Sequence, residues 1–152
     1  LQLQLKDNIQ ANDSLDIVID SLTKRLNNTI WDFDIKFNGK SLLSSIMYIE
    51  SSYNDSAYNS REDAVGCLQI RKTMVNDVNR ILKRKGKTIR YTYNDRWDRY
   101  KSIEMFRIYC EYYGLDSAEE IARCWNGGPR GINKPTTVNY WNKVKTKMGI
   151  NS

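Results

Sequence analysis

The segment Ser41-Leu42-Leu43-Ser44-Ser45-Ile46-Met47-Tyr48-Ile49-Glu50-Ser51 decides the fold. Its apolar positions are so closely spaced that a helix here is apolar nearly all round, which predicts a central, buried helix capped by Ser41. The helix closes on Glu50, and a polar loop begins at Ser51. A carboxylate at the end of a buried helix has one dry side, which raises its pKa and suits it to general acid chemistry.

Helical spacing of apolar residues recurs along the rest of the chain. It predicts an amphipathic helix over 14–28 and a helix around 74–82 that ends in the basic run 83–87. Further helices are predicted over 96–113, over 118–126 behind a Ser117–Glu120 capping box, and from Thr136 to just before Gly149. Segments 31–40 and 51–66 have the composition of irregular structure and loop, and 88–93 fits either a short extended piece or coil.

The chain shows no internal repeat and no low-complexity linker, so we expect one all-α domain over 1–152. Within it, 1–40 is predicted to be an N-terminal helical extension and 41–148 the functional core. The apolar content of 40% and charged content of 28% are ordinary for a soluble globular protein. No apolar run approaches the roughly 18 residues of a membrane span, so we expect no membrane insertion. The chain begins at Leu1 rather than Met, and we expect any signal peptide or anchor to lie outside it.

The charged and reactive residues limit the chemistry. The net charge of +6 fits either a solubilising surface or attraction to a polyanion, which would be nucleic acid or a bacterial cell wall. The chain has no histidine, which excludes Ser-His and Cys-His catalysis and His-containing zinc sites. The cysteines, Cys67, Cys110 and Cys124, lack metal-ligand spacing, and we expect them to be small buried hydrophobes. No metal or cofactor is expected.

Three segments follow Glu50-Ser51 in an informative order. Gly66-Cys67-Leu68-Gln69 comes next, Trp125-Asn126-Gly127-Gly128-Pro129 comes later, and Thr137-Val138-Asn139-Tyr140 lies near the end. This order resembles the soluble lytic transglycosylases, which are lysozyme-like enzymes that cut the glycan strands of peptidoglycan. The resemblance covers roughly residues 41–148.

The resemblance implies a mechanism with one carboxylate. Glu50 first protonates the leaving oxygen of the β-1,4 bond between N-acetylmuramic acid and N-acetylglucosamine, then acts as base on the muramoyl C6 hydroxyl. The product is a 1,6-anhydromuramoyl end. Ser51 is expected to orient the acid, Gly66 to let the backbone approach substrate, and Gln69 to bond an N-acetyl group. Asn126 is expected to line the same cleft.

The chain departs from the family pattern at two places. Where the family has a Tyr whose hydroxyl reaches the acid, this chain has Trp125, which is left to stack on a sugar or to donate through its indole N–H. Tyr140 is then the candidate to supply the hydroxyl near Glu50. The family places a Ser about nine residues after the Glu to bind the muramoyl N-acetyl group, and here Asn59 or Ser60 takes that place.

Two alternatives stay open. Goose-type lysozyme shares the Glu and Gly-x-x-Gln pattern, and a hydrolase would need a second carboxylate or a positioned water. Asp55, Glu62 and Asp63 lie in the right loop for this, although ordinary loop solvation is the preferred interpretation for all three. A basic non-catalytic module for nucleic acid is disfavoured, because most aromatics fall at helix-core spacing and no nucleic-acid-binding motif is present. We therefore expect an extracytoplasmic, monomeric enzyme with peptidoglycan strands as its partner and no nucleic acid.

Overall fold

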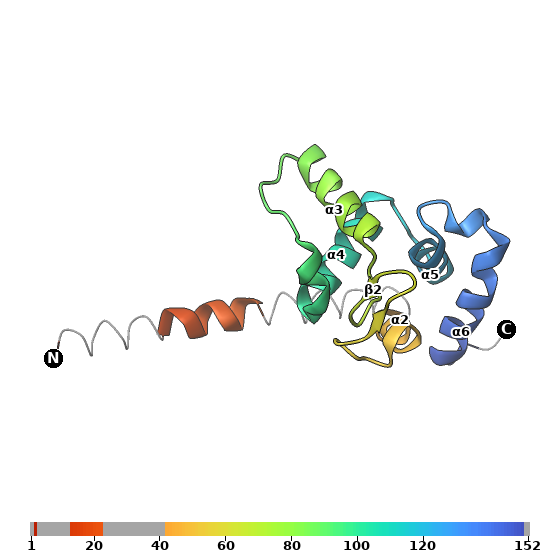
Figure 1. Ribbon diagram of the computed structural model, residues 1–152, viewed down its shortest axis with the longest axis horizontal. Helices are drawn as coiled ribbons and strands as arrows, with labels where there is room; N and C mark the ends of the chain where they lie inside the picture. The colour runs from red at the N-terminus through yellow and green to blue at the C-terminus, as the bar shows by residue number, and fades with distance from the viewer. Residues whose placement is uncertain (1, 3–12, 23–41, 151–152) are drawn as a thin grey trace.

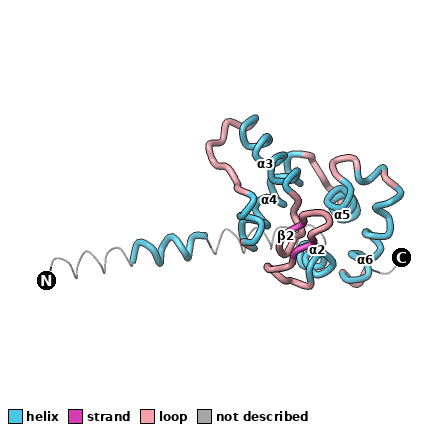
Figure 2. Tube along the Cα trace, viewed as in Figure 1, coloured by secondary structure: helices cyan, strands magenta, loops and turns pink. Residues whose placement is uncertain are grey.

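The computed structural model describes residues 2, 13–22 and 42–150, and it confirms the all-α class (Figures 1 and 2). Short 3₁₀ turns and one small hairpin connect the helices. The helices of segment 42–150 are α2 (Leu42–Ser51), α3 (Lys72–Arg84), α4 (Arg99–Tyr112), α5 (Ala118–Gly127) and α6 (Val138–Lys147). The 3₁₀ turns are η1 (Tyr93–Trp97), η2 (Gly131–Asn133) and η3 (Pro135–Thr137). The hairpin pairs β1 (Tyr58–Asn59) antiparallel with β2 (Ala64–Val65).

Helix α2 lies at the centre of the core, as its composition predicts. Leu42, Leu43 and Ile46 have no exposed surface, and Met47 is 8% exposed. They belong to one cluster of buried side chains that also takes residues from α3, α4, α5 and α6. Full burial of a Leu or Ile side chain contributes about 1.5–3 kcal/mol, so these contacts hold α2 firmly in place.

The other helices form where the apolar spacing predicts them, with two clear differences at their boundaries. The last helix begins at Val138 instead of Thr136, because Pro135–Thr137 forms the 3₁₀ turn η3. The helix predicted over 96–113 is divided, because η1 ends at Trp97 and α4 begins at Arg99. Asp98 separates them: its backbone is extended, and its side chain caps α4 by accepting a hydrogen bond from the Lys101 N–H at 3.0 Å. Ser117 caps α5 in the same way. Segment 88–92 is coil rather than a strand.

The N-terminal predictions are only partly covered by the described residues. Residues 13–22 are helical, in agreement with the corresponding part of the helix predicted over 14–28. The apolar side chains of this helix are exposed: Leu15, Ile17, Val18, Ile19 and Leu22. The remainder of that predicted helix, the irregular segment 31–40 and the Ser41 cap lie outside the described residues. The division of the chain after residue 40 stays a prediction.

The cysteines behave as the sequence predicts. Cys67, Cys110 and Cys124 are all buried and unbridged, with at most 3% of their surface exposed. Over the described ranges 13–22 and 42–150, the acidic and thiol side chains form no cluster able to hold a metal ion. The same part of the chain holds no helix that is both long and apolar enough to span a membrane.

Two arginines fix the loop that follows α2. The buried guanidinium of Arg96 donates hydrogen bonds to the carbonyl oxygens of Asp63 at 2.7 Å and Ile70 at 3.2 Å. Arg99 pairs with the Asp55 carboxylate at 2.9 Å and also donates to the Tyr53 carbonyl. These contacts join the loop to η1 and to the start of α4. Segment 51–70 therefore has a defined shape, although little of it is regular secondary structure.

Gly66 is the position where this loop packs most tightly against η1. Its backbone is left-handed (φ +81°), and a Cβ atom there would lie 2.0 Å from the carbonyl oxygen of Arg96. A side chain at this position therefore meets both backbone strain and a direct collision with main-chain atoms.

We predict that Gly66→Ala destabilises the protein more than Gly86→Ala, which is its matched control. Gly86 is also left-handed (φ +69°), but a Cβ atom there meets nothing within 4 Å. Gly86→Ala should lower the free energy of unfolding by only about 1–2 kcal/mol of backbone strain. Gly66→Ala should lose about 1–3 kcal/mol more because of the collision. Urea unfolding of both variants measures the difference, and equal losses would contradict the tight packing of Gly66 on Arg96.

Candidate active site

The centre of the site is a hydrogen bond between Glu50 and Tyr140. Glu50 lies in the last turn of α2 and Tyr140 in the first turn of α6, 90 positions later in the chain. The Tyr140 hydroxyl donates to Glu50 Oε1 at 2.7 Å. Both side chains are partly buried where α2 and α6 meet. The structure thus brings the sequence-predicted acid and the late tyrosine into direct contact.

The surroundings of Glu50 change its acidity. Burial raises the pKa of its carboxyl from the ordinary 4.5 to about 7. The Tyr140 hydrogen bond and the positive charge of Arg71 act in the opposite direction, whereas the Glu62 carboxylate adds to the increase. Burial and the neighbouring Glu50 also raise the pKa of the Tyr140 hydroxyl well above its usual value, so this group remains a donor. Near neutral pH, Glu50 is therefore able both to give and to take a proton.

Ser51 fixes the end of α2. Its Oγ donates to the Cys67 carbonyl at 2.8 Å and to the Met47 carbonyl at 3.2 Å. It also accepts a hydrogen bond from the Asn54 N–H at 3.1 Å. The partners are all backbone groups, so Ser51 connects α2 to the Gly66–Gln69 segment and sets the position of the neighbouring Glu50 through the helix end.

Gln69 braces the loop. Its backbone is left-handed (φ +50°), and its side-chain Nε2 donates to the carbonyl oxygens of Gly66 at 3.0 Å and Ala57 at 3.3 Å. This amide was predicted to bond a substrate N-acetyl group, whereas its nitrogen binds backbone carbonyls of the loop in the structure. Gly66 likewise meets the backbone of Arg96, which accounts for the glycine without an approaching substrate. Direct substrate contact by Gly66 or Gln69 stays a prediction.

The structure buries Trp125, which leaves its ring little surface for the sugar stacking considered from the sequence. Its side chain is only 8% exposed and packs edge-on against Phe106 and Tyr109, with ring centroids 4.8 and 5.8 Å away. Its indole N–H donates to the Leu68 carbonyl at 3.4 Å rather than to Glu50. Trp125 is a core residue, and its hydrogen bond to Leu68 supports the Gly66–Gln69 segment.

The remaining predicted contacts lie at the surface. Asn59 is exposed on β1, where its Oδ1 accepts a hydrogen bond from the Arg61 N–H at 3.1 Å and shapes the hairpin turn. Ser60 is exposed in that turn, and Asn126 is exposed near the end of α5. Their accessibility permits substrate contact, and their roles stay predictions.

The loop carboxylates are ion-paired, which corrects the interpretation that they are only solvated. Asp55 pairs with Arg99 at 2.9 Å. Asp63 lies 3.6 Å from the Arg96 guanidinium and 3.4 Å from the Lys72 ammonium. Glu62 pairs with Arg71 at 2.6 Å. Asp55 and Asp63 thus belong to the contacts that shape the loop, and Glu62 is the one of the three whose charge affects the Glu50 pKa.

Sequence reasoning missed Arg71. This residue precedes α3, two positions after Gln69, and its charge opposes the increase in the pKa of Glu50. A lone arginine between a loop and a helix is too common to be noticed in a sequence. The available signal was its position directly after the Gly-x-x-Gln segment, close to a carboxylate expected to be buried.

Comparison with known proteins shows a short similarity to lysozymes. No family model matches the chain. A lysozyme of Ostrea edulis is 49% identical over 37 residues, which are 24% of this chain and 27% of that protein. Invertebrate-type lysozyme 6 of Caenorhabditis elegans is 42% identical over 40 residues, 26% of this chain and 29% of that protein. The matches span less than a third of either relative, and they support a lysozyme-like protein without deciding its reaction.

We predict that Glu50→Gln changes the pH dependence of stability. A native pKa of about 7 against an unfolded value near 4.5 means that the folded state holds the Glu50 proton over an interval where the unfolded chain has lost it. In the wild type, the contribution of protonated Glu50 to the free energy of unfolding is complete at low pH. It is lost as the pH rises to 7, by up to about 3 kcal/mol at about 1.4 kcal/mol per pKa unit. Urea unfolding between these pH values should show the variant gaining stability relative to wild type. A constant difference would contradict the raised pKa.

We predict that Tyr140→Phe raises the pKa of Glu50 above about 7. The hydroxyl stabilises the ionised carboxylate, and its removal leaves burial less opposed. Carbon NMR titration of the Glu50 carboxyl measures this shift. Tyr100→Phe is the matched control, because Tyr100 is 60% exposed on α4, and it should leave the Glu50 titration unchanged. An unaltered titration in Tyr140→Phe would remove the hydrogen bond from the account of Glu50 acidity.

Proposed function

We propose that the protein is a lytic transglycosylase of peptidoglycan, which cleaves the β-1,4 bond after N-acetylmuramic acid and leaves 1,6-anhydromuramoyl ends. The observation that carries this proposal is the Glu50 carboxyl, buried, held by Tyr140 and given a pKa of about 7. Glycoside cleavage requires an acid that is protonated near neutral pH. The three loop carboxylates are occupied by ion pairs, which favours a mechanism that uses Glu50 alone.

The proposed reaction has two proton transfers through the same carboxyl group. In the first, protonated Glu50 gives its proton to the leaving glycosidic oxygen as the bond from the muramoyl C1 breaks and positive charge develops on the sugar. In the second, the ionised Glu50 accepts the proton of the muramoyl C6 hydroxyl as that oxygen bonds to C1. No water is consumed. A carboxyl pKa near the working pH suits both steps, because neither protonation state is strongly preferred.

Tyr140 contributes to the second half of this cycle. Its hydroxyl donates to Glu50 Oε1, and such a bond is stronger when the carboxylate is charged. Tyr140 therefore stabilises Glu50 after the first proton transfer and keeps its other oxygen free to face the sugar. Ser51 and the Gly66–Gln69 segment hold the helix end on which this geometry rests.

The second candidate function is hydrolysis by a lysozyme-type muramidase. Two observations favour it: the relatives with short matching segments are named lysozymes, and Glu62 lies close enough to influence the Glu50 pKa. An enzyme of this type needs a second carboxylate or a positioned water. Glu62 would have to leave its 2.6 Å pair with Arg71 to act as that base. Either reaction implies an extracytoplasmic site of action on the cell wall.

The products of digestion distinguish these functions. We predict that purified peptidoglycan incubated with the protein yields anhydromuramoyl ends in mass spectrometry, and that Glu50→Gln abolishes them. Glu111→Gln is the control, because Glu111 is an exposed glutamate on α4 and should leave the yield unchanged. Reducing ends in place of anhydro ends would establish the hydrolase. No cleavage products at all would contradict both enzymatic proposals.

A further inference from the structure

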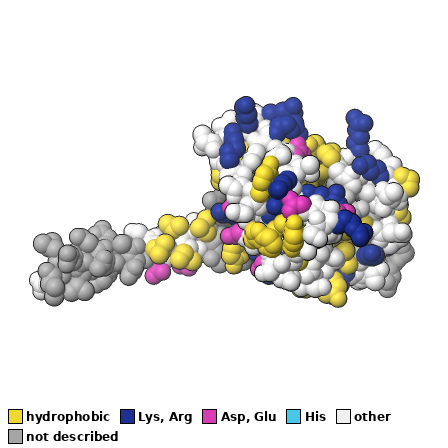
Figure 3. All heavy atoms as spheres, viewed as in Figure 1, with side chains coloured by type: hydrophobic (Ala, Val, Ile, Leu, Met, Phe, Trp, Pro, Cys, Tyr) yellow, Lys and Arg dark blue, Asp and Glu magenta, His cyan; other side chains and the backbone are white. Residues whose placement is uncertain are grey.

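The positive charge of the chain is concentrated in its C-terminal part. All 18 Asp and Glu residues lie at or before Glu120, and 18 of the 24 Lys and Arg residues lie in the same stretch. Residues 1–120 are therefore neutral, and residues 121–152 carry the entire net charge of +6. Six basic side chains supply it: Arg123, Arg130, Lys134, Lys143, Lys145 and Lys147. Figure 3 shows Lys and Arg side chains on the side of the molecule where Figure 1 places α6, as well as at the far end of α3.

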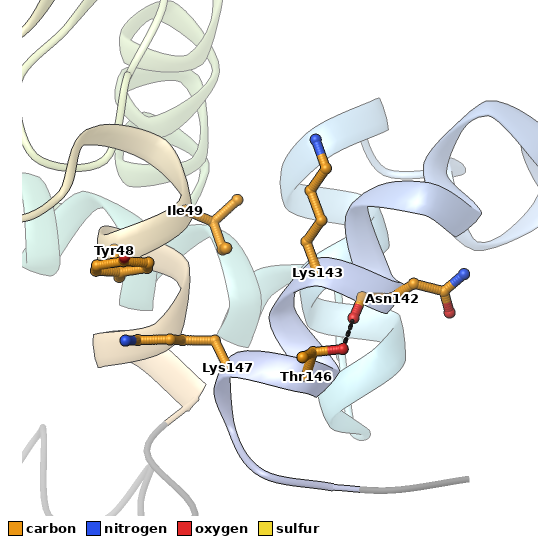
Figure 4. Close-up of a pocket in the computed structure, with 6 residues that line it drawn as sticks. All are labelled: Tyr48, Ile49, Asn142, Lys143, Thr146 and Lys147. Carbon is orange, nitrogen blue, oxygen red and sulfur yellow. Dashed lines mark hydrogen bonds between the residues drawn. The ribbon is translucent and has the colours of Figure 1, made fainter.

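A groove of about 660 Å³ lies between α2 and α6, in this basic part of the molecule. No acidic residue lines it. The lining residues, shown in Figure 4, are Tyr48, Ile49, Asn142, Lys143, Thr146 and Lys147. This composition offers positive charge and a small apolar surface, and it presents nothing that would repel an anion.

The groove lies between the same two helices, α2 and α6, that the Glu50–Tyr140 hydrogen bond connects. On α2, Tyr48 and Ile49 immediately precede Glu50. On α6, Lys143 and Lys147 follow Tyr140 at spacings of three and seven residues, which places all three on one face of the helix. The pair of helices that carries the Glu50–Tyr140 hydrogen bond therefore also carries both lysines of the groove.

The two ammonium groups are placed on either side of an apolar patch. Lys147 Nζ lies 3.7 Å from the centroid of the Tyr48 ring, and this cation–π contact holds the ammonium in position while leaving its other side accessible. Lys143 extends beside Ile49 (Figure 4) and makes no ion pair with a residue of the described ranges. The combination of two ammonium groups with the apolar surface of Tyr48 and Ile49 suits a short peptide that has both carboxylates and methyl side chains.

We infer that this groove binds the carboxylates of the peptide stems attached to peptidoglycan strands, with Lys143 and Lys147 as the recognition residues. The inference rests on the proposed function for the identity of the substrate. Stem peptides leave the muramoyl lactyl group directly beside the bond that would be cut, so a positively charged, anion-binding groove between the helices that hold Glu50 and Tyr140 is suited to receive them. Nucleic acid is a second polyanion for a basic surface, and the experiment includes it.

Binding to strands with and without peptide tests this inference in the Glu50→Gln background, where no strand is cut. The probes are soluble glycan strands carrying uncrosslinked stems and the same strands after enzymatic removal of the stems. Lys143→Gln/Lys147→Gln should lower the affinity for peptide-bearing strands by about three- to tenfold, the size expected for two solvated charge pairs. The ratio of affinities for the two kinds of strand should fall close to one.

The control is Lys83→Gln/Lys87→Gln, which removes the same charge from exposed positions at the far end of α3 and should keep the ratio of the parent. The inference is overturned if both double variants lower the ratio of the two affinities equally, or if the groove variant retains the ratio of the parent. An equal loss of affinity for a DNA duplex would also overturn it, because the groove would then be a general polyanion surface. Binding does not require catalysis, so a lysine-dependent preference without cleavage products would support the groove and refute the proposed reaction.

Discussion

The main physical constraint on the structure is the burial of a carboxylic acid, Glu50, at the end of its central helix, α2. Ionising Glu50 at its raised pKa of about 7 instead of 4.5 costs up to about 3 kcal/mol at higher pH. The same helix carries Leu42, Leu43 and Ile46, which are fully buried and contribute about 1.5–3 kcal/mol each. The burial of these three side chains therefore outweighs the penalty of ionising Glu50 in the last turn of α2.

The loop after α2 shows how the remaining carboxylates are kept apart from that acid. Arg96 of η1 and Arg99 at the start of α4 pair with Asp63 and Asp55, and they also donate hydrogen bonds to carbonyl groups of the same loop. These pairs shape the loop and at the same time compensate its negative charge. Among the ion pairs of this loop, only Arg71–Glu62 still affects the pKa of Glu50: Arg71 lowers it and Glu62 raises it. Glu50 thus owes its raised pKa mainly to burial.

The sequence predicts most of the helices, because apolar periodicity depends on neighbours within one or two turns. Boundaries fixed by a single cap, such as Asp98 before α4, are harder to see inside a long apolar pattern. The contact of Tyr140 with Glu50 could be anticipated because a motif marked both positions, although their distance in the chain gave no physical signal.

The burial of Trp125 was not predicted, because the motif marks a position in the sequence but not the direction in which its side chain points. Its spacing of four from Ile121, another core residue, was the signal available. The collision that requires glycine at position 66 involves Arg96, thirty residues away, and no local pattern contains it.

The basic C-terminal part and the acid at Glu50 lie close together, and their effects are nevertheless separable. The groove lysines are exposed, so water and salt screen their field within a Debye length of about 8 Å at physiological ionic strength. Neither Lys143 nor Lys147 is among the groups that shift the pKa of Glu50, whereas burial, Tyr140, Arg71 and Glu62 are. An arrangement of this kind allows positive charge to attract an anionic polymer without making the acid too strong to hold its proton. Helix α6 serves both purposes from a single face, since Tyr140 at its start touches the carboxyl and the lysines of the later turns face the groove. The position of α6 against α2 is therefore the geometric link between the raised pKa of Glu50 and the proposed binding groove, and shifting this helix would disturb both.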